Sequence, residues 1–194
     1  MYSLPRAGSN PDFLFKIMLI GDGRVGKTSL IFRYLTSYFN EDYKRTIGVN
    51  ISVKRIDDLK AYDRDNYSVE LHIWDLGGQN KFGFLNKSFY DGTSGALLVY
   101  DITNFESYEH LDKWINELQR NTRSGYSGKH VPVIVLGNKA DLEENRKVKT
   151  EDSFKWTREK DLTHIETSAK DGKNVEESFI RLAEIMVENY MKSS

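Results

Sequence analysis

Apolar runs and amphipathic segments alternate along most of this chain. Continuous apolar runs predict buried strands at residues 13–20, 95–102 and 131–137, and a short strand is predicted at 162–166. Residues 49–56 and 67–74 alternate apolar with polar side chains instead. We interpret these two segments as the strands of a long hairpin, joined by the charged, turn-rich residues 57–66.

Apolar residues spaced three and four apart predict the helices. They cover residues 26–38, 79–91, 105–118, 150–158 and 175–190, and the second is weak because a glycine lies inside it. Asn104 and Thr150 are candidate N-caps, and Asn174 with Glu177 resembles a capping box. Strands that alternate with helices predict an α/β fold with a mostly parallel sheet, whose ligands bind at the carboxyl ends of the strands.

Composition narrows the possible functions. The chain has 194 residues and a net charge of −1, which gives no support for a nucleic-acid partner. It has no cysteine, so it has no disulfide, thiolate metal site or acceptor for a direct lipid anchor. No apolar run approaches the roughly 18 residues of a membrane span. We expect a monomeric cytoplasmic protein, peripheral on membranes only through a removed lipidated tail or an adaptor.

Residues 21–28, GDGRVGKT, match the phosphate-binding pattern G-x-x-x-x-G-K-[ST] between a predicted strand and a predicted helix. Glycines let the loop curl until its N–H groups point at phosphate oxygens. Lys27 can reach the β- and γ-phosphates, and the Thr28 hydroxyl can ligate Mg²⁺. The following helix N-terminus also favours negative charge. The alternative is a glycine-rich turn that binds nothing.

A second cluster, Trp74 to Gln79, follows the hairpin. Asp75 suits a carboxylate that holds a metal ion directly or through water. Gly78 can bring its N–H close to a γ-phosphate, and Gln79 can orient an attacking water. In the loop before the hairpin, Thr46 can add a second hydroxyl to Mg²⁺. Each of these residues alone also fits an ordinary loop.

The cluster NKAD, residues 138–141, is predicted to select the base of the bound nucleotide. One carboxylate can accept hydrogen bonds from both N1–H and the 2-amino group of guanine, whereas adenine would leave it unpaired. Such a site can discriminate by about 10⁴–10⁵. Asp141 is therefore the predicted specificity residue, while Asn138 can brace the loop and the Lys139 stem can pack along the purine. Backbone N–H groups of residues 167–170, TSAK, can reach the guanine carbonyl.

Together, GDGRVGKT, TIG, DLGGQ, NKAD and ETSAK resemble the five guanine-nucleotide motifs of Ras-superfamily small GTPases. The likeness covers about residues 15–190 and is greatest to the Rab branch, with a GGQ similar to the Arf branch. It implies a three-layer P-loop G domain over residues 13–192, preceded by a flexible extension at 1–12. That domain has a six-stranded, mostly parallel sheet with one antiparallel hairpin strand, and about five helices.

The resemblance also implies a function: a GTP/GDP switch in membrane trafficking that uses Mg²⁺ and hydrolyses GTP slowly without an activating protein. It assigns Gln79 and Lys27 to catalysis, and Thr28, Thr46 and Asp75 to Mg²⁺. The residues expected to contact the nucleotide are Gly23, Arg24, Val25, Gly26, Lys27, Thr28, Ser29, Phe39, Tyr43, Thr46, Gly78, Asn138, Lys139, Asp141, Ser168, Ala169 and Lys170.

Effectors, exchange factors and GTPase-activating proteins are expected to contact residues 39–51 and 74–91. Ile51, Trp74 and Phe89 match an apolar triad that effectors of the Rab branch contact. The alternative is that these side chains only pack against the sheet. For Phe39, expected to lie edge-on against the base, the alternative is likewise a core position.

Some features depart from the family pattern or leave alternatives open. Leu76, Gly77 and Asn80 replace the usual residues beside Gln79 and could alter hydrolysis or exchange. Arg24 or Arg45 could act as an internal arginine finger, and the alternative is that both are ordinary solvent-exposed arginines. The four histidines share no metal-ligand spacing, and we interpret them as structural or solvent-facing. Rival functions are another P-loop NTPase, which NKAD argues against, and a non-hydrolysing GTP-bound interaction module, which Gln79 argues against.

Overall fold

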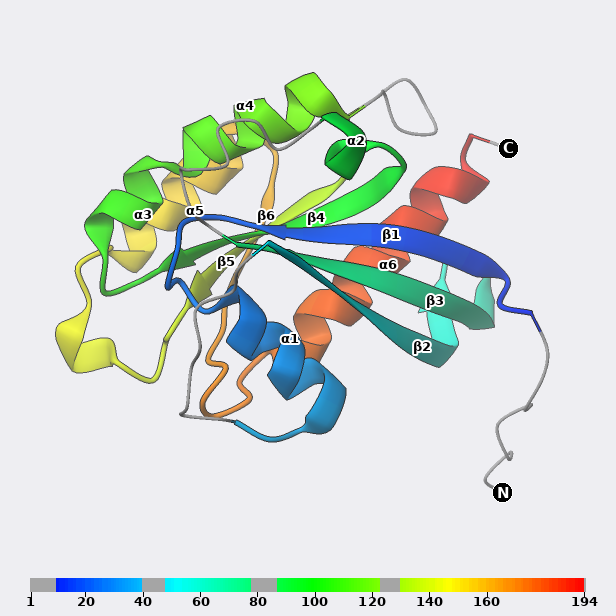
Figure 1. The fold of residues 1–194 in the computed structure, drawn as a ribbon, viewed down its shortest axis with the longest axis horizontal. Coiled ribbons are helices and arrows are strands. Elements are labelled where there is room, and N and C mark those ends of the chain that lie inside the picture. Colours follow the sequence, from blue (N-terminus) through cyan, green and yellow to red (C-terminus); the bar gives the residue numbers. More distant parts are fainter. Residues whose placement is uncertain (1–9, 40–47, 78–86, 123–129, 194) are drawn as a thin grey trace.

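The computed structural model describes residues 10–39, 48–77, 87–122 and 130–193. Within them, six strands form one sheet in the order β2-β3-β1-β4-β5-β6 (Figure 1). Only β2 and β3 pair antiparallel among these strands, as the sequence predicted. The strands are β1 (Phe13–Ile20), β2 (Val49–Ala61), β3 (Arg64–Leu76), β4 (Thr93–Asp101), β5 (Val133–Asn138) and β6 (Thr163–Glu166).

Helices cover both faces of the sheet and complete the predicted three layers. On one face lie α1 and α6, and on the other lie α3, α4 and α5 (Figure 1). The described helices are α1 (Lys27–Thr36), α2 (Lys87–Tyr90), α3 (Phe105–Glu109), α4 (Leu111–Asn121), α5 (Thr150–Glu159) and α6 (Val175–Met191), with a short 3₁₀ helix at Glu143–Asn145. None of these helices is both long and apolar enough to cross a bilayer.

Strand β1 confirms that a continuous apolar run indicates a central strand that is buried on both faces. Phe15 and Ile17 pack toward α1 and α6, while Met18 and Ile20 pack in the core beneath α4. Side chains of a strand alternate between the two faces, so a strand covered on both sides must be apolar at successive positions.

The hairpin differs from the prediction, because most of the charged residues 57–66 are strand rather than connection. Strand β2 continues to Ala61, and Ala61 pairs with Arg64 across a two-residue turn. Register shifts on both sides of Leu59, with Asp58 at φ 62°, bend the strand there. Leu59 is only 3% exposed, so the inward-facing positions continue through a stretch whose turn-forming residues suggested a loop.

The predicted helix 105–118 is two helices, because α3 ends and α4 begins around His110. The apolar spacing continues across this break. Hydrophobic periodicity shows which side chains face the core, but it does not show a change of backbone conformation at a single residue. Of the predicted helix 79–91, residues 87–91 are described, and Lys87–Tyr90 of these form the short helix α2.

Two of the three predicted N-cap positions are confirmed, but none of the three side chains makes a cap bond. Asn104 stands at an N-cap position but makes no side-chain cap bond. Thr150 is the first residue of α5, and its hydroxyl donates to Oε1 of Glu166 at 3.2 Å. Asn174 has φ 55°, and its Nδ2 donates to the Glu166 carbonyl at 2.8 Å. A tertiary partner, Glu166, has taken the polar groups that local pattern assigned to the helix ends.

Candidate nucleotide-binding site

Four predicted clusters meet at one edge of the sheet. Parallel pairing brings the carboxyl ends of β1, β3, β5 and β6 together there, with Leu19 opposite Asp75 and Gly137 opposite Glu166. The phosphate loop follows β1 and TSAK follows β6, whereas Asp75 lies at the end of β3 and NKAD begins at the last residue of β5. The sheet therefore brings together motifs that lie more than a hundred residues apart in the chain, as an α/β sheet is expected to do.

The phosphate loop needs glycine at its two ends. Gly21 has φ 134°, and a Cβ there would lie 2.1 Å from the Val99 carbonyl oxygen. Gly26 has φ 98°, and a Cβ there would lie 2.2 Å from Nδ2 of Asn138. Between them Arg24 is exposed at φ 69°, a conformation that few non-glycine residues adopt. A side chain at either glycine would push the loop away from its supports.

Lys27 lies inside this loop with only 5% of its surface exposed. Its Nζ donates to the carbonyl oxygens of Gly21 at 2.8 Å and Asp22 at 2.7 Å. Burial lowers the pKa of Lys27 to about 8, while the charges of Asp75 and Asp22 act in the opposite direction. The ammonium group is thus held at the centre of the curl, where phosphate oxygens would restore the charge stabilisation that burial removes.

Thr28 and Asp75 form a pair of oxygen ligands beside the loop. The Thr28 hydroxyl donates to Oδ2 of Asp75 at 2.5 Å, and Asp75 is 1% exposed. Hydroxyl and carboxylate oxygens are what Mg²⁺ prefers, and Mg²⁺ commonly takes few protein ligands beside water and phosphate. No group of three or more His, Asp or Glu side chains within the described residues could hold a metal ion. The donor set therefore fits Mg²⁺ shared with a nucleotide.

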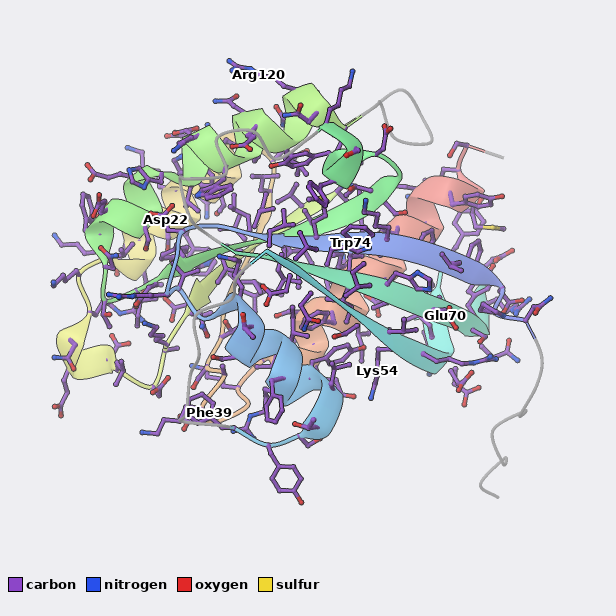
Figure 2. All side chains as sticks on the ribbon, in the orientation of Figure 1. Asp22, Phe39, Lys54, Glu70, Trp74 and Arg120 are labelled. Carbon is purple, nitrogen blue, oxygen red and sulfur yellow. The ribbon has the colours of Figure 1, made fainter. Side chains whose placement is uncertain are left out.

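A cavity of about 340 Å³ opens between the phosphate loop and the NKAD and TSAK loops. It is lined by Gly26, Ser29, Phe39, Asn138, Lys139, Asp141, Leu142, Ala169 and Lys170. All but Leu142 were predicted from the sequence. Phe39, labelled in Figure 2, lines this cavity and also packs against the core, so the two alternatives for it are compatible. Leu142, an exposed apolar residue directly after NKAD, was missed.

Asn138 joins three loops of the site. Its Nδ2 donates to the Val25 carbonyl at 2.8 Å, which fastens the phosphate loop. Its Oδ1 accepts from the Thr167 hydroxyl and from the Ala169 N–H, both at 3.3 Å. Asn138 is 1% exposed and its amide braces these loops, as predicted, while the residue also lines the cavity.

Asp141 is oriented by a neighbour rather than left free in solvent. The Ser168 hydroxyl donates to Oδ1 of Asp141 at 2.7 Å and accepts from the Asp171 N–H at 3.0 Å. This bond leaves the other carboxylate oxygen for a ligand. The Ser168 hydroxyl thus orients Asp141, and the predicted nucleotide contact of the TSAK backbone stays a prediction.

Comparison with known proteins identifies the family. The Ras family model matches residues 16–188. The chain belongs to the Ras family. Ras-related protein Rab-13 of Canis lupus familiaris is 39% identical over 172 residues, 89% of this chain and 79% of that protein. Ras-related protein RIC1 of Oryza sativa is 38% identical over 172 residues, 89% and 80% of the two chains. Ras-related protein RABA4d of Arabidopsis thaliana is 38% identical over 171 residues, 88% and 72%.

These relatives confirm the likeness to the Rab branch. Membership of the Ras family implies a small GTPase switch that binds GTP and GDP. It removes the rival interpretation of an unrelated P-loop NTPase, and it lends no support to a non-hydrolysing module.

Several predicted residues of this Ras-family site lie outside the described residues. They are Tyr43, Arg45, Thr46, Gly78, Gln79 and Asn80. Their expected contacts with the γ-phosphate, Mg²⁺ and the attacking water therefore stay predictions.

Two contacts of the Ras-family site were not predicted. Lys139 forms an ion pair of 2.5 Å with the buried carboxylate of Asp101, while its stem lines the base cavity. Asp22 of the phosphate loop accepts from Nδ1 of His110 at 2.7 Å and from Nε1 of Trp114 at 2.8 Å (Figure 2). Both depend on residues brought together by folding, and no motif signals them.

The apolar triad lies on the β2–β3 side of the sheet. Ile51 is 51% exposed, while Trp74 and Phe89 are half-buried with ring centroids 6.4 Å apart. Nζ of Lys16 lies 3.9 Å from the centre of the Trp74 ring and donates to the Phe89 carbonyl at 2.6 Å. The two aromatics are thus packed in place, and Ile51 presents an open apolar surface beside them.

Proposed function

We propose that this chain is a Rab-type switch that cycles between GDP and GTP and hydrolyses GTP slowly by itself. One observation carries the proposal: the buried Lys27 loop, the Thr28–Asp75 pair and the Asp141 cavity share one edge of the sheet. A guanine nucleotide with Mg²⁺ has matching parts in that order, namely phosphates, metal ion and base.

The proposed chemistry is positioning and charge neutralisation. Lys27 and the loop N–H groups would hold the β- and γ-phosphates, and Gln79 would align a water in line with the γ-phosphate. Thr28, Asp75 and Thr46 would hold Mg²⁺, which when bound would neutralise charge on the phosphates. Phe39 and Asp141 would hold the base, and Asn138 would keep their loops in register.

The proposed switch consists of residues 39–51 and 74–91. Thr46 and Gly78 would each lose a contact when the γ-phosphate leaves, which would release both segments. A described contact supports their coupling, because the Gly77 N–H donates to the Gly48 carbonyl at 3.1 Å. The two segments are thereby joined at their bases, beside the unusual Leu76–Gly77 pair.

The Rab relatives support a role in membrane trafficking through effectors, exchange factors and GTPase-activating proteins. The apolar surface around Ile51 and Trp74 is where we place effector contact.

Two measurements test the proposal. Purified protein should bind fluorescent GDP, and unlabelled GTP but not ATP should compete. In single-turnover assays, bound GTP should be converted to GDP, and Gln79→Leu should slow that step by at least about tenfold, whereas the control Gln119→Leu on α4 should not. Absence of turnover in the unaltered protein would favour the non-hydrolysing module, and equal competition by ATP would refute guanine selectivity.

A further inference from the structure

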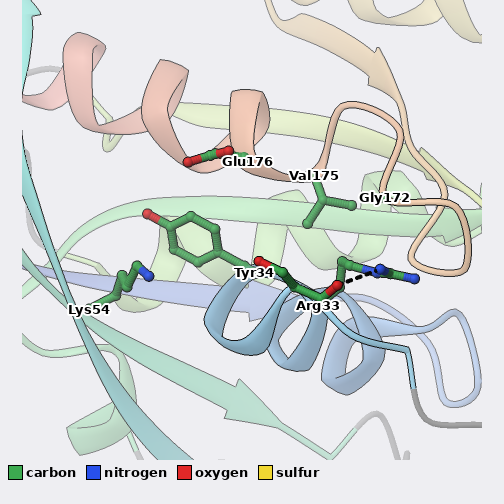
Figure 3. A pocket seen from close by; sticks show the side chains of 7 residues that line it. Arg33, Tyr34, Lys54, Gly172, Val175 and Glu176 are labelled. Carbon is green, nitrogen blue, oxygen red and sulfur yellow. Dashed lines mark hydrogen bonds between the residues drawn. The ribbon is translucent and has the colours of Figure 1, made fainter.

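Arg33, in the last turn of α1, contacts three backbone carbonyls around the base cavity. Its Nε donates to the Ala169 carbonyl at 2.7 Å, and one terminal nitrogen donates to the Lys170 carbonyl. The other terminal nitrogen donates to the Ser37 carbonyl at 2.8 Å (Figure 3). One planar guanidinium group thus joins the end of its own helix to a loop that lies 136 positions further along the chain.

Each of these segments forms a different wall of the base cavity. Ala169 and Lys170 line it directly. Ser37 caps α1 with φ 61° and donates its N–H to the Arg33 carbonyl at 2.8 Å. Two residues later Phe39 also lines this cavity. Asn138, a further lining residue, is tied separately to the phosphate loop.

The loop that Arg33 holds has internal bonds that fix its shape. The Gly172 N–H donates to the Ser168 carbonyl at 2.8 Å, and the Ser168 N–H donates to the Lys173 carbonyl at 3.1 Å. Gly172 has φ 83°, and a Cβ there would lie 3.8 Å from Cδ of Arg33, so the arginine stem lies over this turn. What these bonds leave open is the position of the loop relative to α1.

We infer that Arg33 is a positioning residue that sets how long the guanine nucleotide stays bound, by fixing the TSAK loop against the end of α1. The inference rests on the proposed function. It gives α1 a second role beyond its N-terminus: its first turn faces the phosphates, and its last turn holds both walls around the base. Nothing in the sequence motifs assigns this role, because Arg33 lies outside all of them.

Removing Arg33 should loosen the site without unfolding the protein. The side chain is half-buried and lines an open cavity of about 240 Å³ between α1, β2 and α6. Water can therefore reach the three carbonyls when the guanidinium is absent, so the large penalty of a buried unpaired group does not arise. The contacts of Asn138 and Ser168 also remain.

The test is the dissociation rate of fluorescent GDP. Arg33→Ala should raise it by about tenfold or more, and Arg33→Lys should lie between, because a compact ammonium group cannot bond all three carbonyls. The control Arg181→Ala removes an exposed arginine paired with Glu184 on α6 and should leave the rate unchanged. Single-turnover hydrolysis of bound GTP should stay within about twofold, since Arg33 contacts none of the phosphate-loop residues.

A second measurement separates positioning from general destabilisation. In 6-thio-GDP a sulfur, a weaker hydrogen-bond acceptor, replaces the guanine carbonyl oxygen that the TSAK loop is proposed to contact. If Arg33 acts through that loop, the preference of the protein for GDP over 6-thio-GDP should shrink in Arg33→Ala. An unchanged GDP dissociation rate, or a faster rate with the preference unchanged, would overturn the inference. Failure of the unaltered protein to bind GDP would instead refute the proposed function.

Discussion

The Thr28 hydroxyl donates a hydrogen bond of 2.5 Å to Oδ2 of Asp75, across a gap of 47 positions in the chain. The strand β3 delivers the carboxylate, and the first turn of α1 delivers the hydroxyl. The fold itself holds the two oxygens in contact, so little rearrangement would be needed for them to bind Mg²⁺.

Thr28→Val should weaken the dependence of nucleotide retention on Mg²⁺, because valine keeps the shape and removes the oxygen. Removing Mg²⁺ with EDTA should raise the GDP dissociation rate strongly in the unaltered protein. In the variant, the factor by which EDTA raises that rate should be at least about tenfold smaller. The matched control is Thr36→Val at the other end of α1, where the Thr36 hydroxyl donates to the Phe32 carbonyl and accepts from the Tyr38 N–H. An equal EDTA response in Thr28→Val would contradict the Mg²⁺ assignment.

Asp141→Asn should abolish guanine preference, because an amide cannot accept from two adjacent donors with both of its groups. GTP affinity should fall by about 10²-fold or more. Ser168→Ala should show a smaller loss, since it removes the bond that orients the carboxylate. The exposed neighbour Asp171 provides the control Asp171→Asn, and competition binding with GTP and ATP is the measurement. Unchanged GTP affinity in Asp141→Asn would refute the base-recognition assignment.

Lys27 should make nucleotide affinity fall as pH rises through about 8. Burial lowers its pKa to about 8 in the free protein, so above that pH the ammonium must first take up a proton to pair with phosphate. Titrating GDP affinity between pH 7 and 9 should show this loss, and Lys27→Met should bind weakly at all pH values without it. Ionisation of the nucleotide itself affects both proteins equally and cancels in the comparison. Parallel profiles would contradict the prediction.

The same shift should affect folding of the nucleotide-free protein in the opposite direction. The pKa of Lys27 is lower in the folded state than its ordinary 10.5, so the unfolded chain binds more protons between about 8 and 10.5. Stability should therefore rise with pH in the lower part of that window, by about 1.4 kcal/mol per pH unit at most, and Lys27→Met should lack this rise. Urea unfolding at pH 8 and 9 tests it.

His164 should make the protein sensitive to acid. Burial lowers its pKa to about 4, with Glu166 opposing and Arg146 adding to the shift, and the Tyr100 hydroxyl lies 3.0 Å from Nε2. The unfolded chain protonates near 6.5, so stability is full above pH 6.5 and is lost as pH falls toward 4. Between pH 6.5 and 5 the loss should be about 2 kcal/mol. Urea unfolding with saturating GDP should show a smaller loss in His164→Gln, and the control His130→Gln, at an exposed position, should behave like the unaltered protein.

Trp114→Phe should destabilise the phosphate loop by removing one donor to Asp22 while keeping most of the packing. The lost bond is made to a carboxylate, so the cost should be about 1–3 kcal/mol, with faster GDP release. Trp156→Phe is the control, because the Nε1 of Trp156 also donates to a carboxylate, that of Asp112, but in an exposed bond that does not involve the phosphate loop. Similar costs for the two variants would contradict a special role for the Asp22 contact.

The sequence predicted the order and type of most elements, and the structure corrected their ends. Central strands such as β1 were recognisable because burial on both faces demands apolar residues throughout. The predicted hairpin strands were several residues too short. Asp58 and its neighbours are residues that favour turns, but tertiary packing buries Leu59 and keeps this stretch in the strand. The side chains of Thr150 and Asn174 make no cap bond and instead donate to Glu166, a tertiary partner that local sequence does not show. Local preference is weak beside a buried partner.

For the site, the sequence by itself determined the chemical groups: a lysine in a glycine-rich loop, a hydroxyl and carboxylate for Mg²⁺, and a carboxylate for guanine. These groups can be recognised from the sequence because each of them belongs to a short motif whose residues lie close together in the chain. Only the tertiary structure decided what supports them. The links from Asp22 to Trp114, from Ser168 to Asp141 and from Arg33 to the Ala169 carbonyl join segments far apart in the chain. Such contacts arise only when the sheet has brought the loops together, so no local pattern can encode them.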